Sequence, residues 1–245
     1  MSELSQLSAA MANPSATIPQ VALSGVSRYF GRFAALRSIT ASFPAARIYA
    51  VVGENGAGKS TLLRILAGLV PASRGTVAWF GADNLSLVRE RISYMAHASL
   101  LYDELDAREN LRYFAGLYGI REDRVCEDAM RLVGLDAALK RQVGQYSQGM
   151  RQRLSLARAI LHQPELLLLD EPFSNVDASS AHAMVRLLGQ MRDQGRTVLV
   201  VTHQPALLAG MADEFVRMAE GRIVARTAGL SEPLPAFPAA HEVMR

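Results

Sequence analysis

Residues 53–60 carry the sequence GENGAGKS, the most direct candidate for chemistry in the chain. This spacing predicts a phosphate-binding loop, because glycines let successive backbone N–H groups converge on phosphate oxygens. An apolar run at 48–52 predicts the strand before the loop, and 61–67 predict a helix whose N-terminus adds positive potential. The loop therefore predicts nucleotide binding. The residues expected to contact the nucleotide are Gly53, Asn55, Gly56, Gly58, Lys59, Ser60 and Thr61.

Two side chains of this loop suit the phosphates and a metal ion. Lys59, one of two lysines in the chain, is expected to contact the β- and γ-phosphates and to assist catalysis. The hydroxyl of Ser60 is expected to hold Mg²⁺. A chance glycine-rich turn would explain the glycines but would not need a strand before it and a helix after it.

An acidic pair follows the leucine-rich run at 165–170, which has the pattern of a buried strand. Asp170 ends this run and is expected to order the ligand shell of Mg²⁺. Glu171 comes next and is expected to polarise the attacking water as a general base. Acidic strand ends are common, so the upstream phosphate-binding loop is what favours the catalytic interpretation.

Length and composition exclude several classes of protein. The 245 residues suffice for one large α/β domain or for a domain with an inserted lobe. No apolar run approaches the roughly 20 residues that cross a bilayer, and the N-terminus lacks the features of a signal peptide. The single cysteine, Cys126, excludes an intrachain disulfide and fits a reducing compartment. We therefore expect a cytoplasmic protein.

The charge balance raises nucleic acid as an alternative ligand. The formal net charge is +3 and the isoelectric point is near 9.2. The arginines, however, are scattered through helical patterns and form no long basic tract. We expect solvated helix surfaces and no nucleic-acid partner, although a basic exterior would also suit anionic lipid headgroups.

Strand and helix patterns alternate along the chain. Besides the two strands above, the strand patterns lie at 21–26, 39–43, 76–80, 91–95 and 197–201. Helical patterns cover 99–145 and 178–194, and a capping box at 106–109 predicts the start of a helix within the first of them. Apolar strands that alternate with helices predict an α/β fold with a mostly parallel sheet. The expected organisation is a flexible tail at 1–18, a domain at 19–228 with a helical subdomain at about 98–160, and an irregular tail at 229–245.

Residues 146–153, YSQGMRQR, complete a set of motifs that resembles the ATP-binding-cassette (ABC) ATPases. The segment occupies the place of the family's signature motif, and the resemblance extends from about residue 21 to residue 228. It implies a P-loop NTPase core with an antiparallel β lobe and an inserted helical subdomain. It also implies ATP and Mg²⁺ as ligands, a second copy of the chain and integral membrane subunits as partners, and a location on the inner face of the cell membrane.

The family pattern assigns roles to further residues of this chain. Ser147 and Gly149 would bind the γ-phosphate of ATP held by the second copy, whereas Tyr146, Gln148 and Met150 depart from the usual Leu-Ser-Gly-Gly-Gln. His203 would contact the γ-phosphate and Glu171. Asp177 would help couple the two sites, although by itself it is also an ordinary helix N-cap. Phe30 would stack on adenine, with Tyr29 as a neighbouring alternative and a core aromatic as another.

His97 is a further departure, since the family usually has glutamine at this hinge between the core and the helical lobe. It would sense Mg²⁺ through a metal-bound water, and residues 97–105 would help form the groove for the membrane subunits. The histidine and the signature region resemble the ATPases of haem exporters used in cytochrome c maturation. An exporter of another cargo stays open, as do a soluble nucleic-acid or ribosome-associated cassette ATPase and, less simply, a small-molecule kinase.

Overall fold

A six-stranded sheet forms the centre of the computed structural model, which describes residues 20–229. Its strand order is β5-β6-β7-β3-β8-β9, and only β9 runs antiparallel to its neighbour. The strands are β3 (Ile48–Val52), β5 (Ile92–Met95), β6 (Leu166–Asp170), β7 (Thr197–Val201), β8 (Glu214–Ala219) and β9 (Arg222–Thr227). Every residue of β3, β6 and β7 is buried, as expected for parallel strands covered on both faces.

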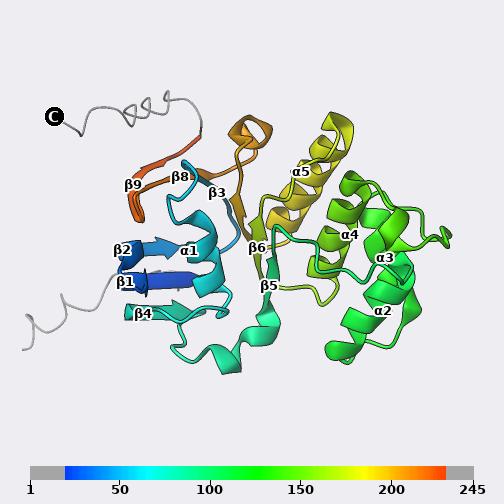
Figure 1. Ribbon diagram of the computed structural model, residues 1–245, viewed down its shortest axis with the longest axis horizontal. Coiled ribbons are helices and arrows are strands. Elements are labelled where there is room, and N and C mark those ends of the chain that lie inside the picture. The colour runs from blue at the N-terminus through cyan, green and yellow to red at the C-terminus, as the bar shows by residue number, and fades with distance from the viewer. Residues whose placement is uncertain (1–19, 230–245) are drawn as a thin grey trace, which may run out of the picture.

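A second, antiparallel sheet covers one side of this core. It comprises β1 (Val21–Phe30), β2 (Phe33–Phe43) and β4 (Arg74–Trp79) in the order β2-β1-β4. Helix α1 (Lys59–Leu66) leaves β3 through the phosphate-binding loop and packs between the two sheets (Figure 1). The indole nitrogen of Trp79 donates to the carbonyl of Leu66 over 2.7 Å, which fixes the end of α1 to β4.

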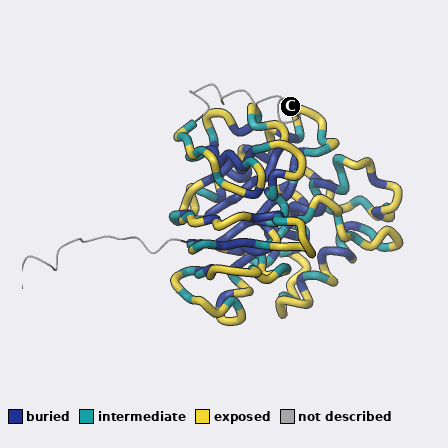
Figure 2. The backbone as a smooth tube through the Cα atoms, turned by 60° about the vertical axis from the view of Figure 1, so that its left-hand side comes forward, coloured by how far each residue is buried: buried dark blue, intermediate teal, exposed yellow. Residues whose placement is uncertain are grey.

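The helical lobe lies at the opposite end of the molecule (Figure 1). Its helices are α2 (Ala107–Leu117), α3 (Asp123–Leu132) and α4 (Gln148–Ile160), and α5 (Ala178–Asp193) packs beside them on the core. Short 3₁₀ turns occupy Leu85–Leu87, Arg89–Arg91, Val143–Gln145 and Pro205–Leu208. Figure 2 shows the buried backbone running through the middle of the molecule, with exposed turns around it.

Side-chain caps determine where the helices of the lobe begin. The expected capping box is present, because the carboxylate of Asp106 accepts from the N–H of Glu109 while the carboxylate of Glu109 accepts from the N–H of Asp106. Ser147 caps α4 by accepting from the N–H of Met150 over 3.2 Å. Asp177 caps α5 through the N–H of Ser180.

The predicted fold class is confirmed, and most predicted strands and helices are present. Strands β1 and β2 are longer than expected, because the antiparallel pair continues through bulges to the turn between Phe30 and Phe33. Strands β8 and β9 were missed. Strand β9 lies at the sheet edge, where its residues alternate in exposure, and Arg217 interrupts the apolar run of the buried strand β8. The predicted tails lie almost entirely outside the described residues. Among residues 20–229, no helix combines the length and apolarity that a membrane span requires.

Candidate nucleotide-binding site

The predicted phosphate and metal residues meet where three parallel strands end. Val51 pairs with Val201 across β3 and β7, and Val201 pairs with Asp170 across β7 and β6. The phosphate-binding loop, Glu171 and His203 therefore leave the sheet from the same row. Ligands of open α/β sheets bind at this edge, beyond the carboxyl ends of the strands.

The backbone of the phosphate-binding loop needs its glycines. Gly58 precedes α1 with φ +98°, and a Cβ added there would lie 2.6 Å from the carbonyl oxygen of Ala35. The ammonium of Lys59 donates to the carbonyls of Gly53 and Glu54 over 2.7 and 2.9 Å, and the lysine is 6% exposed. Burial lowers the pKa of Lys59, while the nearby carboxylates oppose that shift. The Lys59 ammonium therefore lies inside the phosphate-binding loop, where it is expected to contact phosphate.

Asp170 offers oxygen to a hard cation. Its carboxylate accepts from the Ser60 hydroxyl over 3.0 Å and from the Tyr94 hydroxyl over 3.3 Å, and the residue is 2% exposed. Hydroxyl and carboxylate oxygens fit Mg²⁺, which is usually held by one or two protein oxygens together with substrate phosphates and water. Residues 20–229 contain no cluster of three His, Cys, Asp or Glu side chains for an all-protein metal site.

Glu171 stands in a left-handed backbone conformation with φ +56°, which is unusual for a residue with a side chain. The backbone N–H of His203 donates to its Oε2 over 3.2 Å, and the His203 Nε2 lies 3.3 Å from Oε1. Oε1 is buried yet has no hydrogen-bond partner among the described residues. Burial raises the pKa of the Glu171 carboxyl, an effect that the His203 N–H and imidazole oppose. A basic oxygen is thus left available beside the phosphate-binding loop.

A cavity of about 560 Å³ joins these groups. Among the predicted residues, it is lined by Asn55, Gly56, Gly58, Lys59, Ser60, Thr61, His97, Asp170, Glu171 and His203. The cavity is also lined by Phe33 and Arg64, which sequence reasoning missed. Arg64 could have been found, because it lies four residues after Ser60 on the same face of α1.

The structure separates other predicted residues from this cavity. Phe30 is 47% exposed and stacks under the guanidinium of Arg28, and the aromatic ring that lines the cavity is Phe33. Phe30 therefore stays a prediction for adenine stacking, with Phe33 as a structural alternative. Gly53 lies at the base of the loop, where a Cβ would meet the carbonyl of Met218 at 2.2 Å.

Ser147 and Gly149 lie beside a neighbouring cavity of about 550 Å³. The two cavities share His97 and Ser174, and the second is lined by Tyr146 and Gln148. Ser147 is exposed at the start of α4. The start of α4 is therefore accessible at Ser147, and its contact with the nucleotide of a second copy stays a prediction.

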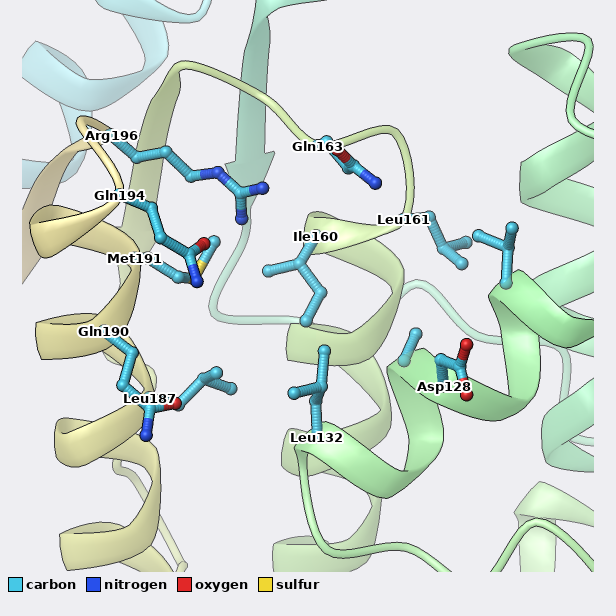
Figure 3. A pocket seen from close by; sticks show the side chains of 12 residues that line it. Asp128, Leu132, Ile160, Leu161, Gln163, Leu187, Gln190, Met191, Gln194 and Arg196 are labelled. Atoms are coloured by element: carbon cyan, nitrogen blue, oxygen red, sulfur yellow. The ribbon is translucent and has the colours of Figure 1, made fainter.

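A third cavity, of about 210 Å³, lies away from both (Figure 3). It opens between α3, the end of α4 and α5, and is lined by apolar side chains such as Leu132, Ile160 and Leu187 with Arg196 above them. None of the predicted site residues lines it.

Comparisons with known proteins identify this arrangement. Residues 36–174, more than half of the chain, match the model of the ABC transporter family. The chain belongs to the ABC transporter ATP-binding family. It is 31% identical over 201 residues to the ABC transporter ATP-binding protein NatA of Bacillus subtilis, covering 79% of this chain and 82% of that protein. It is 39% identical over 206 residues to an aliphatic sulfonates import ATP-binding protein, SsuB 2, of Pseudomonas aeruginosa, covering 83% of this chain and 73% of that protein.

A solved structure shows the same fold. The ABC chain superimposes with a TM-score of 0.77 on an ATP-binding cassette determined as a dimer in a post-hydrolysis state with ADP and Pi. The two are 23% identical, and the match covers 85% of this chain and 98% of the other. Family and fold together make this chain an ATP-binding ATPase of the ABC transporter class.

Lysine substitution gives a direct test of the nucleotide site. Lys59→Ala removes a charge from the loop and should weaken ATP binding at least about tenfold, because a charge-assisted contact contributes ~1.5–3 kcal/mol. Lys140→Ala, at the other lysine of the chain, is the matched control and should bind ATP normally. Binding is measured by isothermal titration calorimetry. Equal affinity for both variants would contradict the assignment of Lys59.

Proposed function

We propose that this ABC ATPase powers a membrane transporter as a head-to-tail dimer that sandwiches two ATP molecules. Each ATP would lie between the phosphate-binding loop of one copy and Ser147–Gly149 of the other, in a closed two-fold arrangement. The exposed Ser147 at the start of α4 supports this proposal, as does the dimeric state of the solved cassette described above. Asp177, which caps α5 after the loop that follows Glu171, would help to couple the two nucleotide sites.

Glu171 is the proposed general base for hydrolysis. The observation that carries this role is the place of Glu171 in the wall of the cavity that Lys59 and Ser60 also line, with an Oε1 that makes no hydrogen bond to the described residues. The oxygen would accept the proton of the attacking water. His203, 3.3 Å from that carboxylate, would contact the γ-phosphate and hold the glutamate in place.

Mg²⁺ is the proposed cofactor, with Ser60 and Asp170 as its protein ligands. When bound, the ion neutralises negative charge that develops on the phosphates. His97 borders the nucleotide cavity and would meet a metal-bound water through its imidazole. Lys59 would hold the β- and γ-phosphates, exchanging its present contacts with loop carbonyls for phosphate oxygens.

Glu171→Gln tests this mechanism. The variant keeps the shape of the side chain but removes the base, so turnover should fall at least about 100-fold while ATP still binds. The unhydrolysed nucleotide should hold the two copies together, giving an ATP-dependent dimer in size-exclusion chromatography. Glu122→Gln, remote from the cavity, is the control. A monomer with unchanged turnover would contradict both the base and the dimer.

A groove beside the helical lobe supports the proposed docking of membrane subunits. Its apolar side chains Leu69, Leu100 and Tyr118 are 61%, 63% and 44% exposed, an unusual gathering of exposed apolar surface. The guanidinium of Arg158 lies over the Phe114 ring and donates to the Leu100 carbonyl. The groove adjoins the segment 97–105, where the membrane subunits are expected.

Leu100→Asp tests the docking surface. A charge in the apolar groove should reduce copurification of the integral membrane subunits, because docking would have to bury that carboxylate. Turnover of the isolated ATPase should stay unchanged. Leu132→Asp, 56% exposed on α3, is the matched control and should copurify normally. Equal recovery of membrane subunits with both variants would exclude the groove.

The cargo proposed from the resemblance of His97 and of residues 146–150 is haem for cytochrome c maturation. The relatives named above carry other cargo names or none, so this proposal rests on those residues alone. Deleting the gene should abolish haem-stained c-type cytochromes, and the intact gene should restore them. Normal c-type cytochromes in the deletion strain would exclude haem export and leave the ATPase assignment untouched.

A further inference from the structure

One partly buried hydrogen bond joins the helix capped by Ser147 to the backbone of Glu171. The side-chain amide of Gln152 on α4 donates to the carbonyl oxygen of Glu171 over 2.8 Å. Gln152 is 7% exposed, so water competes little for this bond. The two residues are 19 positions apart and belong to different parts of the molecule, the helical lobe and the end of β6.

The backbone conformation of Glu171 needs hydrogen bonds from neighbouring groups to hold it. Its left-handed φ of +56° is unfavourable for a residue with a side chain, so neighbouring contacts must hold it. The N–H of Glu171 donates to the Val201 carbonyl over 2.9 Å, which fixes one side of the residue to β7. On the other side, the carbonyl accepts from the Ser174 N–H over a long 3.3 Å and from Gln152 over 2.8 Å. The Gln152 amide is therefore the shorter of the two contacts at this carbonyl.

The same helix also touches the loop that follows Glu171. A Cβ added at Gly149 would lie 3.3 Å from the Asn175 carbonyl oxygen, so the first turn of α4 packs closely against this loop. Gln152 and Ser174 both line the cavity next to the start of α4. A displacement of α4 would therefore move the Gln152 amide that bonds the Glu171 carbonyl.

We propose that Gln152 is a positioning residue for Glu171, linking helix α4 of each copy to the general base in that same copy. This inference rests on the proposed role of Glu171. Contact between the Ser147 end of α4 and nucleotide in the opposite site would be transmitted through one helical turn to the Glu171 carbonyl. Hydrolysis at one site would then depend on what the other site holds.

Gln152→Met tests the proposal, because methionine keeps the length of the side chain and removes the N–H donor. The turnover number should fall about tenfold, since small displacements of a reacting group are costly, while KM for ATP should not change. Gln190→Met on α5, where the glutamine is exposed, is the control and should behave as wild type. An unchanged turnover number in Gln152→Met would overturn the proposal.

A second measurement separates positioning from damage to α4. The double variant Glu171→Gln, Gln152→Met should still form the ATP-dependent dimer, because Ser147 and Gly149 are untouched. Loss of this dimer, or a raised KM in the single variant, would assign Gln152 to the shape of the helix and overturn a positioning role. If Glu171→Gln itself leaves turnover unchanged, the proposed function fails first. If that variant behaves as expected and Gln152→Met turns over normally, only the present inference fails.

Discussion

Three parallel strands end at one level of the core sheet, because Val51, Val201 and Asp170 occupy one row of its hydrogen-bonded ladder. This shared row brings Val51 together with two strand ends that lie more than 100 residues later in the chain. A slip of one residue between β6 and β7 would turn Asp170 to the other face of the sheet and remove it from Ser60. The complete burial of these strands opposes such a slip, since it would reverse the face on which every side chain packs.

The charged side chains at this edge of the sheet are largely shielded from water. Lys59 and Asp170 are almost fully buried, and the pKa values of Lys59 and Glu171 are both shifted by burial toward the neutral form. Each charge nevertheless has partners: loop carbonyls surround the ammonium, and two hydroxyls bond the Asp170 carboxylate. Because these partners are polar groups rather than a direct ion pair, phosphate and a cation can exchange with them without first breaking a salt bridge.

Much of this site could be predicted from sequence, because its parts are local. The spacing of the glycines predicts the loop at 53–60, and the apolar strand before the pair Asp170–Glu171 predicts the place of that pair. Tyr94 and Gln152 could not be found this way, because their roles depend on contacts with distant residues. Tyr94 bonds Asp170, 76 positions later in the chain, and Gln152 bonds Glu171, 19 positions later. Strand β9 was missed for a related reason, because an edge strand with alternating exposure carries a weak pattern until its partner is known. Strand β8 is an interior strand, but Arg217 interrupts its apolar run.

Helix α4 contacts two different parts of the molecule through neighbouring residues, and its geometry explains why the two contacts do not compete. Successive residues of an α-helix point about 100° apart. Arg151 accordingly turns toward the segment 97–105, pairing with Asp103 over 2.6 Å and donating to the Ser99 hydroxyl, while its neighbour Gln152 turns toward Glu171. Ser147 remains exposed at the end of the same helix. A rigid helix held in this way cannot shift at the proposed docking segment 97–105 without also shifting at Glu171. Helix α4 would therefore connect movement of the membrane subunits with ATP hydrolysis.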